Sequence, residues 1–218
     1  MFPLGSASRR ILSFPFMTVL VILLNAGAFY LELTQGNAFV AQWSAVPADI
    51  MQGRHLETLL TSMFLHGGWM HIIGNMVFLW AFAPPIEEGM GSGRFILFYL
   101  LGGIAAMATQ MWVAPDSTVP ALGASGAVAA VMGAYLVTYP RDQIRTLVLA
   151  PLFRVISIPA ILLIGVWIAT QVISVTTEMP AGESGGVAYF AHIGGAVFGA
   201  VTGLLFRRHL GVQPTSAG

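Results

Sequence analysis

One hydroxyl and one imidazole stand out in this chain because each lies inside an apolar segment. Ser125 occurs in the string GASG, near the start of an uncharged run from Ser117 to Pro140, and His192 opens a second apolar run, YFAHIGGAVFGAVTGLLF. Polar groups within membrane spans cost free energy unless they are partnered or functional. A serine hydroxyl becomes a nucleophile when a base takes its proton, and imidazole can be that base. The two residues therefore suggest nucleophilic catalysis, provided that the fold brings them together.

Small residues recur at helical spacing after both side chains. Three glycines follow His192 and two small residues follow Ser125: Gly195, Gly199 and Gly203, and Ala129 and Gly133. Such stripes let two helices approach closely, as in G-x-x-x-G packing. We predict that the stripes pack together and that Ser125 meets His192 at a similar depth. The alternative is that Ser125 is only a small packing residue and His192 a hydrogen-bonded packing histidine.

Further hydrogen-bond donors precede these segments. His71 and Asn75 are four residues apart, on one helix face, where they could donate to a developing oxyanion. Ser125 follows a loop that contains Pro120, so we expect it to begin a helix, whose free N–H groups would stabilise the same charge. The alternative for these donors is bonding to backbone carbonyls of the preceding loop, and that interpretation is favoured for His66.

A three-histidine zinc site formed by His66, His71 and His192 is the competing chemistry. Against it, His66 and His71 are five residues apart, no H-E-x-x-H occurs, and no acid lies within a predicted span to act as a general base. The chain has no cysteine, which leaves no thiolate ligand and no disulfide framework. We predict neither a metal ion nor another cofactor.

Membrane-spanning helices must position these residues. The 218-residue chain is 56 % hydrophobic and 8 % charged, with a mean hydropathy of +0.80, whereas a soluble domain carries about 25 % charged residues. Uncharged runs predict an all-α bundle of six transmembrane helices. The runs are Ile11–Leu31, Thr58–Ile86, Phe95–Ala114, Ser117–Pro140, Val155–Thr177 and Ser184–Phe206. The second run is too long for one helix, so we expect a loop first and a helix that begins near Trp69.

The organisation follows from these spans. One membrane domain, residues 11–208, lies between an N-terminal tail of residues 1–10 and a C-terminal tail of residues 209–218. Eight of the nine arginines fall on one side of the spans and only Arg54 on the other, so the positive-inside rule places both termini in the cytoplasm. Nine acidic residues balance the arginines, and no net charge indicates a nucleic-acid partner. The basic content, which is all arginine, and the small core favour a bacterial inner membrane.

Four short motifs, in order along nearly the whole chain, resemble the rhomboid family of intramembrane serine proteases. The nucleophile motif G-x-S-G, the base motif A-H with spaced glycines, the H-x-x-x-N signature after a loop histidine, and E-x-x-x-G-S-G are all present. They occur at Gly123–Gly126, at Ala191, His192, Gly195 and Gly199, at His66 with His71–Asn75, and at Glu87–Gly93.

The resemblance implies a six-helix rhomboid-like bundle in which Ser125 is the nucleophile and His192 the general base, without an acidic third member. It implies an oxyanion hole made by His71, Asn75 and the Ser125 backbone N–H. The fifth span and the loop around Met179–Gly186 would act as lateral gate and cap. Substrates would be transmembrane segments of single-span membrane proteins, cleaved near the outer face.

Two positions depart from the family pattern. Many relatives carry Trp-Arg in the first outer loop, where this chain has Glu57 and Thr58. Some place an aromatic ring four residues after the nucleophile, where this chain has Ala129. We therefore expect another residue, Tyr189 or Phe190, to orient His192.

Two other functions compete with the protease interpretation. A non-catalytic rhomboid-like binder would hold transmembrane clients, but such relatives usually lose the serine or the histidine, and this chain keeps both. A transporter or channel would need an acid inside a span to relay protons or bind cations, or an inverted repeat, and the sequence shows neither. The membrane protease is the favoured interpretation, with the oligomeric state left open.

Overall fold

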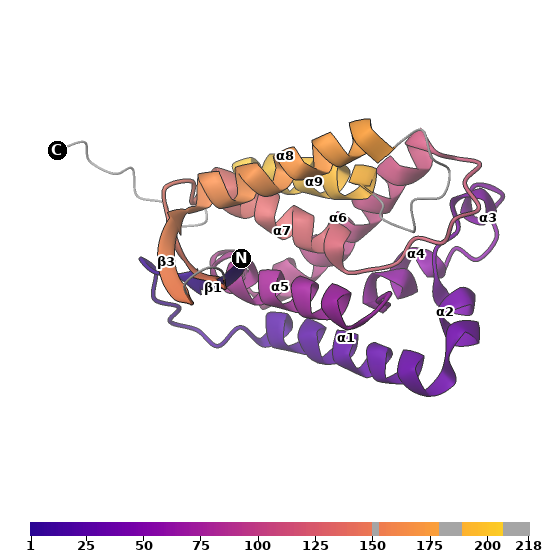
Figure 1. The fold of residues 1–218 in the computed structure, drawn as a ribbon, viewed down its shortest axis with the longest axis horizontal. Coiled ribbons are helices and arrows are strands. Elements are labelled where there is room, and N and C mark those ends of the chain that lie inside the picture. The colour runs from indigo at the N-terminus through magenta and orange to yellow at the C-terminus, as the bar shows by residue number, and fades with distance from the viewer. Residues whose placement is uncertain (150–152, 179–188, 207–218) are drawn as a thin grey trace.

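The computed structural model describes residues 1–149, 153–178 and 189–206, and six longer helices within these ranges form a bundle (Figure 1). They are α1 (Phe16–Gln35), α5 (Trp69–Met90), α6 (Ser92–Val113), α7 (Ser125–Thr138), α8 (Ala160–Glu178) and α9 (Tyr189–Phe206). By length and composition, α1, α5, α6 and α9 can each cross a membrane, and α7 and the Ala160–Ser174 part of α8 are shorter apolar helices. Two predicted boundaries are confirmed, because α5 begins at Trp69 and α7 begins at Ser125.

The short elements gather at two opposite ends of the bundle (Figure 1). One end, which we call the loop end, carries α2 (Asn37–Trp43), α3 (Pro47–Met51), α4 (Thr58–Thr61) and the 3₁₀ turn η1 (Ser62–Phe64). The other, the sheet end, carries the antiparallel sheet β1-β2-β3, built from β1 (Phe2–Ser6), β2 (Gln143–Val148) and β3 (Arg154–Pro159).

This sheet contradicts the all-α prediction. The strings QIRTLV and RVISIP pair along their whole length, with Ile144 opposite Ile158, and the side chain of Ile144 is fully buried. Ile144 and Thr146, at alternate positions of β2, are both fully buried, so one face of this strand packs inward and the segment is not a simple loop. The predicted N-terminal tail is also part of the fold, since its residues Phe2–Ser6 form β1.

The fourth and fifth uncharged runs both begin before their helices. Residues 117–124 form the loop that was expected before Ser125, but Val155, the predicted start of the fifth span, lies in β3. The fifth helix begins only at Ala160, whose N–H donates to the carbonyl oxygen of Asp142 at 2.8 Å. A search for uncharged residues cannot distinguish an apolar strand or loop from the helix that follows it.

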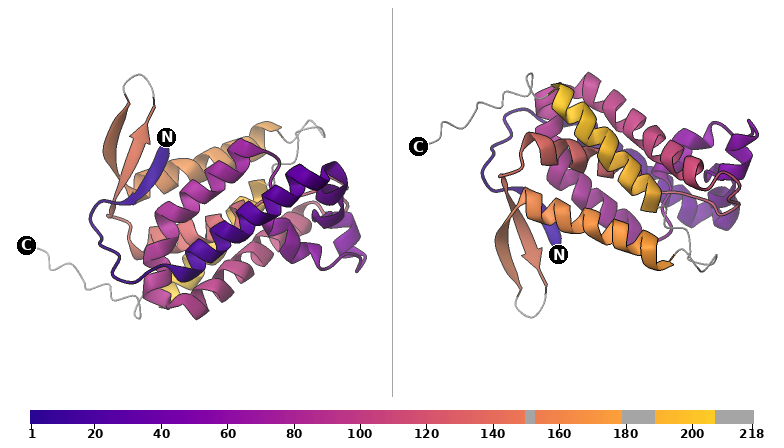
Figure 2. Two further views of the ribbon diagram at one scale, coloured as in Figure 1. Left: turned by 90° about the horizontal axis from the view of Figure 1, so that it is seen from below. Right: turned by 90° about the horizontal axis from the view of Figure 1, so that it is seen from above.

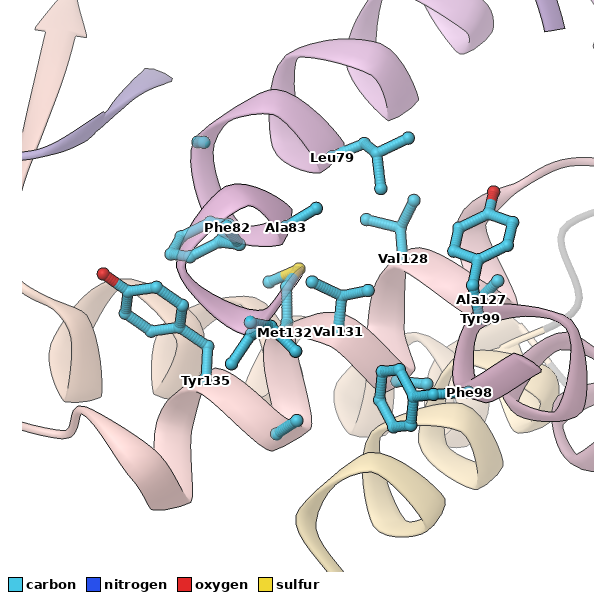
Figure 3. Close-up of a cluster of buried hydrophobic side chains, with 14 of the residues drawn as sticks. Leu79, Phe82, Ala83, Phe98, Tyr99, Ala127, Val128, Val131, Met132 and Tyr135 are labelled. Atoms are coloured by element: carbon cyan, nitrogen blue, oxygen red, sulfur yellow. The ribbon is translucent and has the colours of Figure 1, made fainter. Parts of the chain in front are cut away.

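Helix α7 is the centre of the bundle. Its ten consecutive residues from Gly126 to Tyr135 are all buried. Figure 3 shows part of the cluster of buried side chains around α7, to which Val128 and Tyr135 of α7, Phe82 of α5 and Phe98 of α6 all belong. At 1.5 Å per residue, α7 is about 21 Å long, whereas the 22-residue helices α5 and α6 are each about 33 Å long. The central helix therefore cannot reach both ends of the bundle.

A buried carboxylate at the sheet end joins α1 to α5. Glu87 accepts hydrogen bonds from the N–H groups of Met17 and Thr18, both at 2.8 Å, and from the hydroxyls of Thr18 at 2.7 Å and Ser92 at 2.6 Å. Helix α1 has no N-cap side chain of its own, so Glu87 satisfies its free donors from a neighbouring helix. The predicted second span stopped before Glu87 because it was defined by the absence of charge.

Candidate active site

The loop before α7 is held by backbone hydrogen bonds to two other segments at the loop end, one at Ala45 and one at Ser62. Ala121 and Ala45 exchange backbone hydrogen bonds of 2.8 and 3.0 Å, and the Gly123 N–H donates to the carbonyl oxygen of Ser62 at 2.8 Å. Gly123 has φ of +127°, a conformation that disfavours any residue with a Cβ. These restraints fix the point at which α7 starts, and hence the position of Ser125.

The predicted contact between the two small-residue stripes is confirmed. A Cβ on Gly199 would overlap the carbonyl oxygen of Ala130, a Cβ on Gly195 would overlap that of Gly126, and one on Gly133 would overlap that of Ala196. Backbone therefore lies directly against backbone along the α7–α9 contact, which we call the seam. In the right-hand view of Figure 2, α9 lies between α6 and α8, with α8 at the edge of the bundle.

The seam brings Ser125 and His192 into hydrogen-bonding distance. The Ser125 Oγ lies 2.7 Å from the His192 Nε2, and both side chains are half-buried. The other ring nitrogen, Nδ1, lies 2.6 Å from the Oε1 of Gln171 in α8. Ser125, His192 and Gln171 thus form a continuous polar chain across three helices.

The orientation of the Gln171 amide determines which nitrogen of His192 carries the proton. The amide nitrogen lies 3.2 Å from the Thr170 hydroxyl and 3.4 Å from the Trp167 carbonyl oxygen, which leaves Oε1 to face His192. Oε1 can only accept, so His192 carries its hydrogen on Nδ1 and presents the lone pair of Nε2 to Ser125. This is the tautomer that a general base requires.

Gln171 is the residue that the sequence interpretation missed. We expected Tyr189 or Phe190 to orient His192, but Nδ1 bonds to Gln171, and the Tyr189 ring lies edge-on at 6.4 Å between centroids. The Trp167 ring lies nearer, at 5.6 Å. The available signal was a polar side chain inside an apolar span, the same signal that drew attention to His192.

A cavity of about 560 Å³ opens over the Ser125–His192 pair. It is lined by residues of α5, α7, α8 and α9 and of the loops before α5 and α7: Gly67, Met70, His71, Gly74, Asn75, Phe78, Pro120, Leu122, Ser125, Val128, Met132, Trp167 and His192. Asn75 is only 8 % exposed, and its Nδ2 has no hydrogen-bond partner among the described residues. A buried donor without a partner beside a nucleophile is suited to bind an anion that forms there.

His71 also presents a donor toward this cavity. Its Nδ1 accepts a hydrogen bond of 3.2 Å from the Gly67 N–H, so its hydrogen lies on Nε2. A Cβ on Gly123 would lie only 2.8 Å from this Nε2 and 3.6 Å from the Ser125 Oγ, which places the His71 donor close to the nucleophile. Glycine at position 123 therefore leaves the space in which His71 approaches Ser125.

His66 lies behind His71 rather than in the cavity. The two rings are edge to face, with centroids 5.0 Å apart, and His66 is 2 % exposed. Burial, together with the neighbouring His71, lowers the pKa of His66 to about 4, so this imidazole is neutral at physiological pH. Its backbone N–H donates to the Glu32 carboxylate at 2.9 Å, which ties the loop before α5 to α1.

The remaining sequence expectations concern the cap and the metal. The predicted cap, Met179–Gly186, lies outside the described residues, as does the C-terminal tail. Within the described ranges, no three histidine or acidic side chains form a group that could hold a metal ion. His66, His71 and His192 do not converge on one point, since His66 packs behind His71 and His192 bonds to Ser125 and Gln171.

The architecture and the apolar helices define an integral, multi-pass helical membrane protein with a serine–histidine pair in a cavity. The family model of the rhomboid domain matches residues 53–209, and the chain belongs to the rhomboid family.

Individual relatives agree with this assignment. RHOMBOID-like protein 12, mitochondrial, of Arabidopsis thaliana is 29 % identical over 204 residues, covering 86 % of this chain and 57 % of that protein. Rhomboid protease GluP of Bacillus subtilis is 35 % identical over 127 residues, covering 56 % of this chain and 24 % of that protein. Rhomboid protease GlpG of Pectobacterium atrosepticum is 28 % identical over 117 residues, covering 54 % of this chain and 41 % of that protein. The chain thus spans between about a quarter and just over half of the length of these relatives.

Proposed function

We propose that this protein is an intramembrane serine endopeptidase that cleaves transmembrane segments of single-span membrane proteins. The observation that carries the proposal is the 2.7 Å contact between Ser125 Oγ and His192 Nε2 in a cavity that is also lined by Asn75, whose Nδ2 has no hydrogen-bond partner in the described part of the chain. A purely structural serine–histidine hydrogen bond would need neither the cavity nor a buried donor without a partner.

The proposed reaction proceeds by acyl transfer. The Ser125 Oγ forms a bond to the scissile carbonyl carbon while its proton passes to His192 Nε2. The carbonyl oxygen becomes an oxyanion, stabilised by His71 Nε2–H, the Asn75 amide and the Ser125 N–H at the start of α7. His192 then gives its proton to the leaving nitrogen as the C–N bond breaks. Water, deprotonated by His192, hydrolyses the acyl-enzyme and restores Ser125.

The position of the site explains why a transmembrane segment is the proposed substrate. Cavity residues Phe78, Val128 and Met132 are apolar, and Phe78 lies on α5, which is long and apolar enough to cross a membrane. A helix hides its peptide carbonyls in intrahelical hydrogen bonds, so a substrate helix must unwind locally before Ser125 can attack. Residues near the membrane surface unwind at the lowest cost, because water can satisfy their freed backbone groups.

The proposed orientation places the loop end outside the cytoplasm. Six described arginines lie at the sheet end or in the segments that lead to it, whereas Arg54 lies at the loop end: Arg9, Arg10, Arg94, Arg141, Arg145 and Arg154. By the positive-inside rule the sheet end is cytoplasmic, both termini are cytoplasmic, and the site opens to the outer face, in the setting of a bacterial inner membrane.

Cleavage of a model single-span substrate by the purified protein in bilayers tests this function. We expect Ser125→Ala to lower the cleavage rate by at least about 10³-fold while the protein remains folded. Ser157→Ala is the matched control, because Ser157 is exposed on β3 at the other end of the molecule, and it should retain full activity. A folded native protein that binds such substrates without cleaving them would instead support the non-catalytic binder.

A further inference from the structure

We infer that Gln171 is a positioning residue, which holds His192 in the tautomer that can accept the Ser125 proton. Because Gln171 lies on α8, the ability of His192 to act as the base then depends on the position of α8. The inference rests on the proposed function, because it assigns a task to a residue that contacts the general base rather than the substrate. Its basis is the chain of contacts Ser125 Oγ to His192 Nε2 at 2.7 Å and His192 Nδ1 to Gln171 Oε1 at 2.6 Å.

Without an acceptor at Nδ1, the two neutral tautomers of His192 would compete. One presents a lone pair to Ser125, and the other presents an N–H, which cannot accept a proton from the serine hydroxyl. The Gln171 carbonyl oxygen removes this ambiguity by stabilising only the form with hydrogen on Nδ1. It also fixes the rotation of the ring about its bond to the backbone, as an acidic third member does in a catalytic triad.

The chain supplies no carboxylate for this task among the described residues around the ring. His192 is surrounded by the Trp167 ring, the Tyr189 ring, Ser125 and Gln171. An amide is a weaker acceptor than a carboxylate but remains neutral, so it costs less free energy within a membrane. Thr170 and the Trp167 carbonyl oxygen hold the amide nitrogen and keep Oε1 directed at the ring.

The location of Gln171 on α8 adds a second consequence. Among the α8 residues whose burial the structure describes, up to Ser174, the fully buried ones, Ala160 and Ile164, lie toward the sheet end. No residue from Gly165 to Ser174 is fully buried, so this part of α8 is less tightly packed. A displacement of its other end away from α9 would break the Gln171–His192 bond and leave the α7–α9 seam intact. The base would then lose its fixed tautomer while Ser125 and His192 remained at the same depth.

Gln171→Leu tests the inference, with Gln110→Leu as the matched control. Gln110 lies on α6, and its buried Oε1 has no hydrogen-bond partner among the residues that the structure describes, so the same substitution there removes no bond to His192. We expect Gln171→Leu to lower both the cleavage rate and the rate of Ser125 labelling by a small fluorophosphonate by the same factor, about 10- to 100-fold. Gln171→Glu, which keeps an acceptor at the same position, should restore most of both rates.

A spectroscopic measurement separates this inference from the proposed function. In protein labelled with ¹⁵N-histidine, the His192 signals, identified by their loss in His192→Ala, should report hydrogen on Nδ1 in the native protein and a mixture of tautomers in Gln171→Leu. Gln171→Met provides a second variant of similar length if the leucine variant does not fold. The measurement needs no substrate, so it stands even if the native protein cleaves nothing.

Three results would overturn the inference. They are native labelling and cleavage rates in Gln171→Leu, a loss of cleavage with normal fluorophosphonate labelling, and an unchanged His192 tautomer. The second result would assign Gln171 to substrate entry instead.

Discussion

His192 is held from two sides, and the two contacts differ in kind. On one side, α9 packs on α7 through glycines so close that a single Cβ on Gly199 would overlap a backbone carbonyl. On the other, α8 reaches the imidazole through the Gln171 side chain, and a Cβ added at Gly165 of α8 would meet nothing within 4 Å. The first contact sets the depth at which the histidine meets Ser125. The second sets the direction in which its lone pair points.

This difference shows that one contact sets the position of His192 and a separate contact sets its tautomer. Because backbone packs directly on backbone at the seam, α7 and α9 cannot move relative to each other without disrupting the bundle. A side-chain hydrogen bond from a helix at the edge of the bundle can break and re-form at a modest cost, typically about 1 kcal/mol. A membrane protein that must admit another helix can therefore move α8 without losing the relation between Ser125 and His192.

The largest predicted effect comes from filling the seam. Gly199→Leu should force α9 away from α7 and destabilise the protein by more than about 3 kcal/mol, with activity lost as well, because neither backbone can yield. Thermal unfolding in detergent micelles, followed by circular dichroism, measures the change in stability.

The matched control for that variant is Gly165→Leu, which places the same side chain on α8 in open space. We expect its unfolding temperature to equal or exceed that of the native protein, since leucine favours the helix more than glycine does by up to about 1 kcal/mol. Equal destabilisation by the two variants would contradict the contrast between the seam and α8.

A smaller effect is predicted where α9 meets α6. A Cβ on Gly194 would overlap the side chain of Thr109 rather than backbone, so Gly194→Ala should cost about 1–3 kcal/mol. Thr109→Gly removes all the obstructing atoms, Oγ1, Cβ and Cγ2, so in unfolding measurements Gly194→Ala should cost much less when it is added to Thr109→Gly than when it is added to the native protein. An equal cost in the two backgrounds would mean that this contact does not limit the approach of α9 to α6.

The seam was predictable because small residues at every fourth position have one common use in apolar helices, which is close packing. The helix start at Ser125 was predictable because a proline-containing loop precedes it. The spacing of the small residues predicted that Ser125 meets His192, and the motifs added their roles as nucleophile and base.

Other features could not be read from the sequence in the same way. Gln171 contacts a residue 21 positions later on a different helix, and no periodic pattern records a contact of that kind. The sheet was missed because β1 and β2 lie far apart in the chain, with Ser6 paired to Ile144, and because apolar strands near a membrane resemble parts of a span. Glu87 was placed outside its helix because charge alone was used to end the span, although its partners satisfy it fully.

The central claim is that close packing of α7 and α9 delivers His192 to Ser125 as its base. The most direct test is the second-order rate constant for reaction of Ser125 with a fluorophosphonate, measured in the native protein, in His192→Ala and in His55→Ala, where the histidine is exposed in the segment before α4. We predict fast labelling of the native protein and of His55→Ala, and a rate at least about 10³-fold lower in His192→Ala. A native rate of labelling in His192→Ala would contradict the claim.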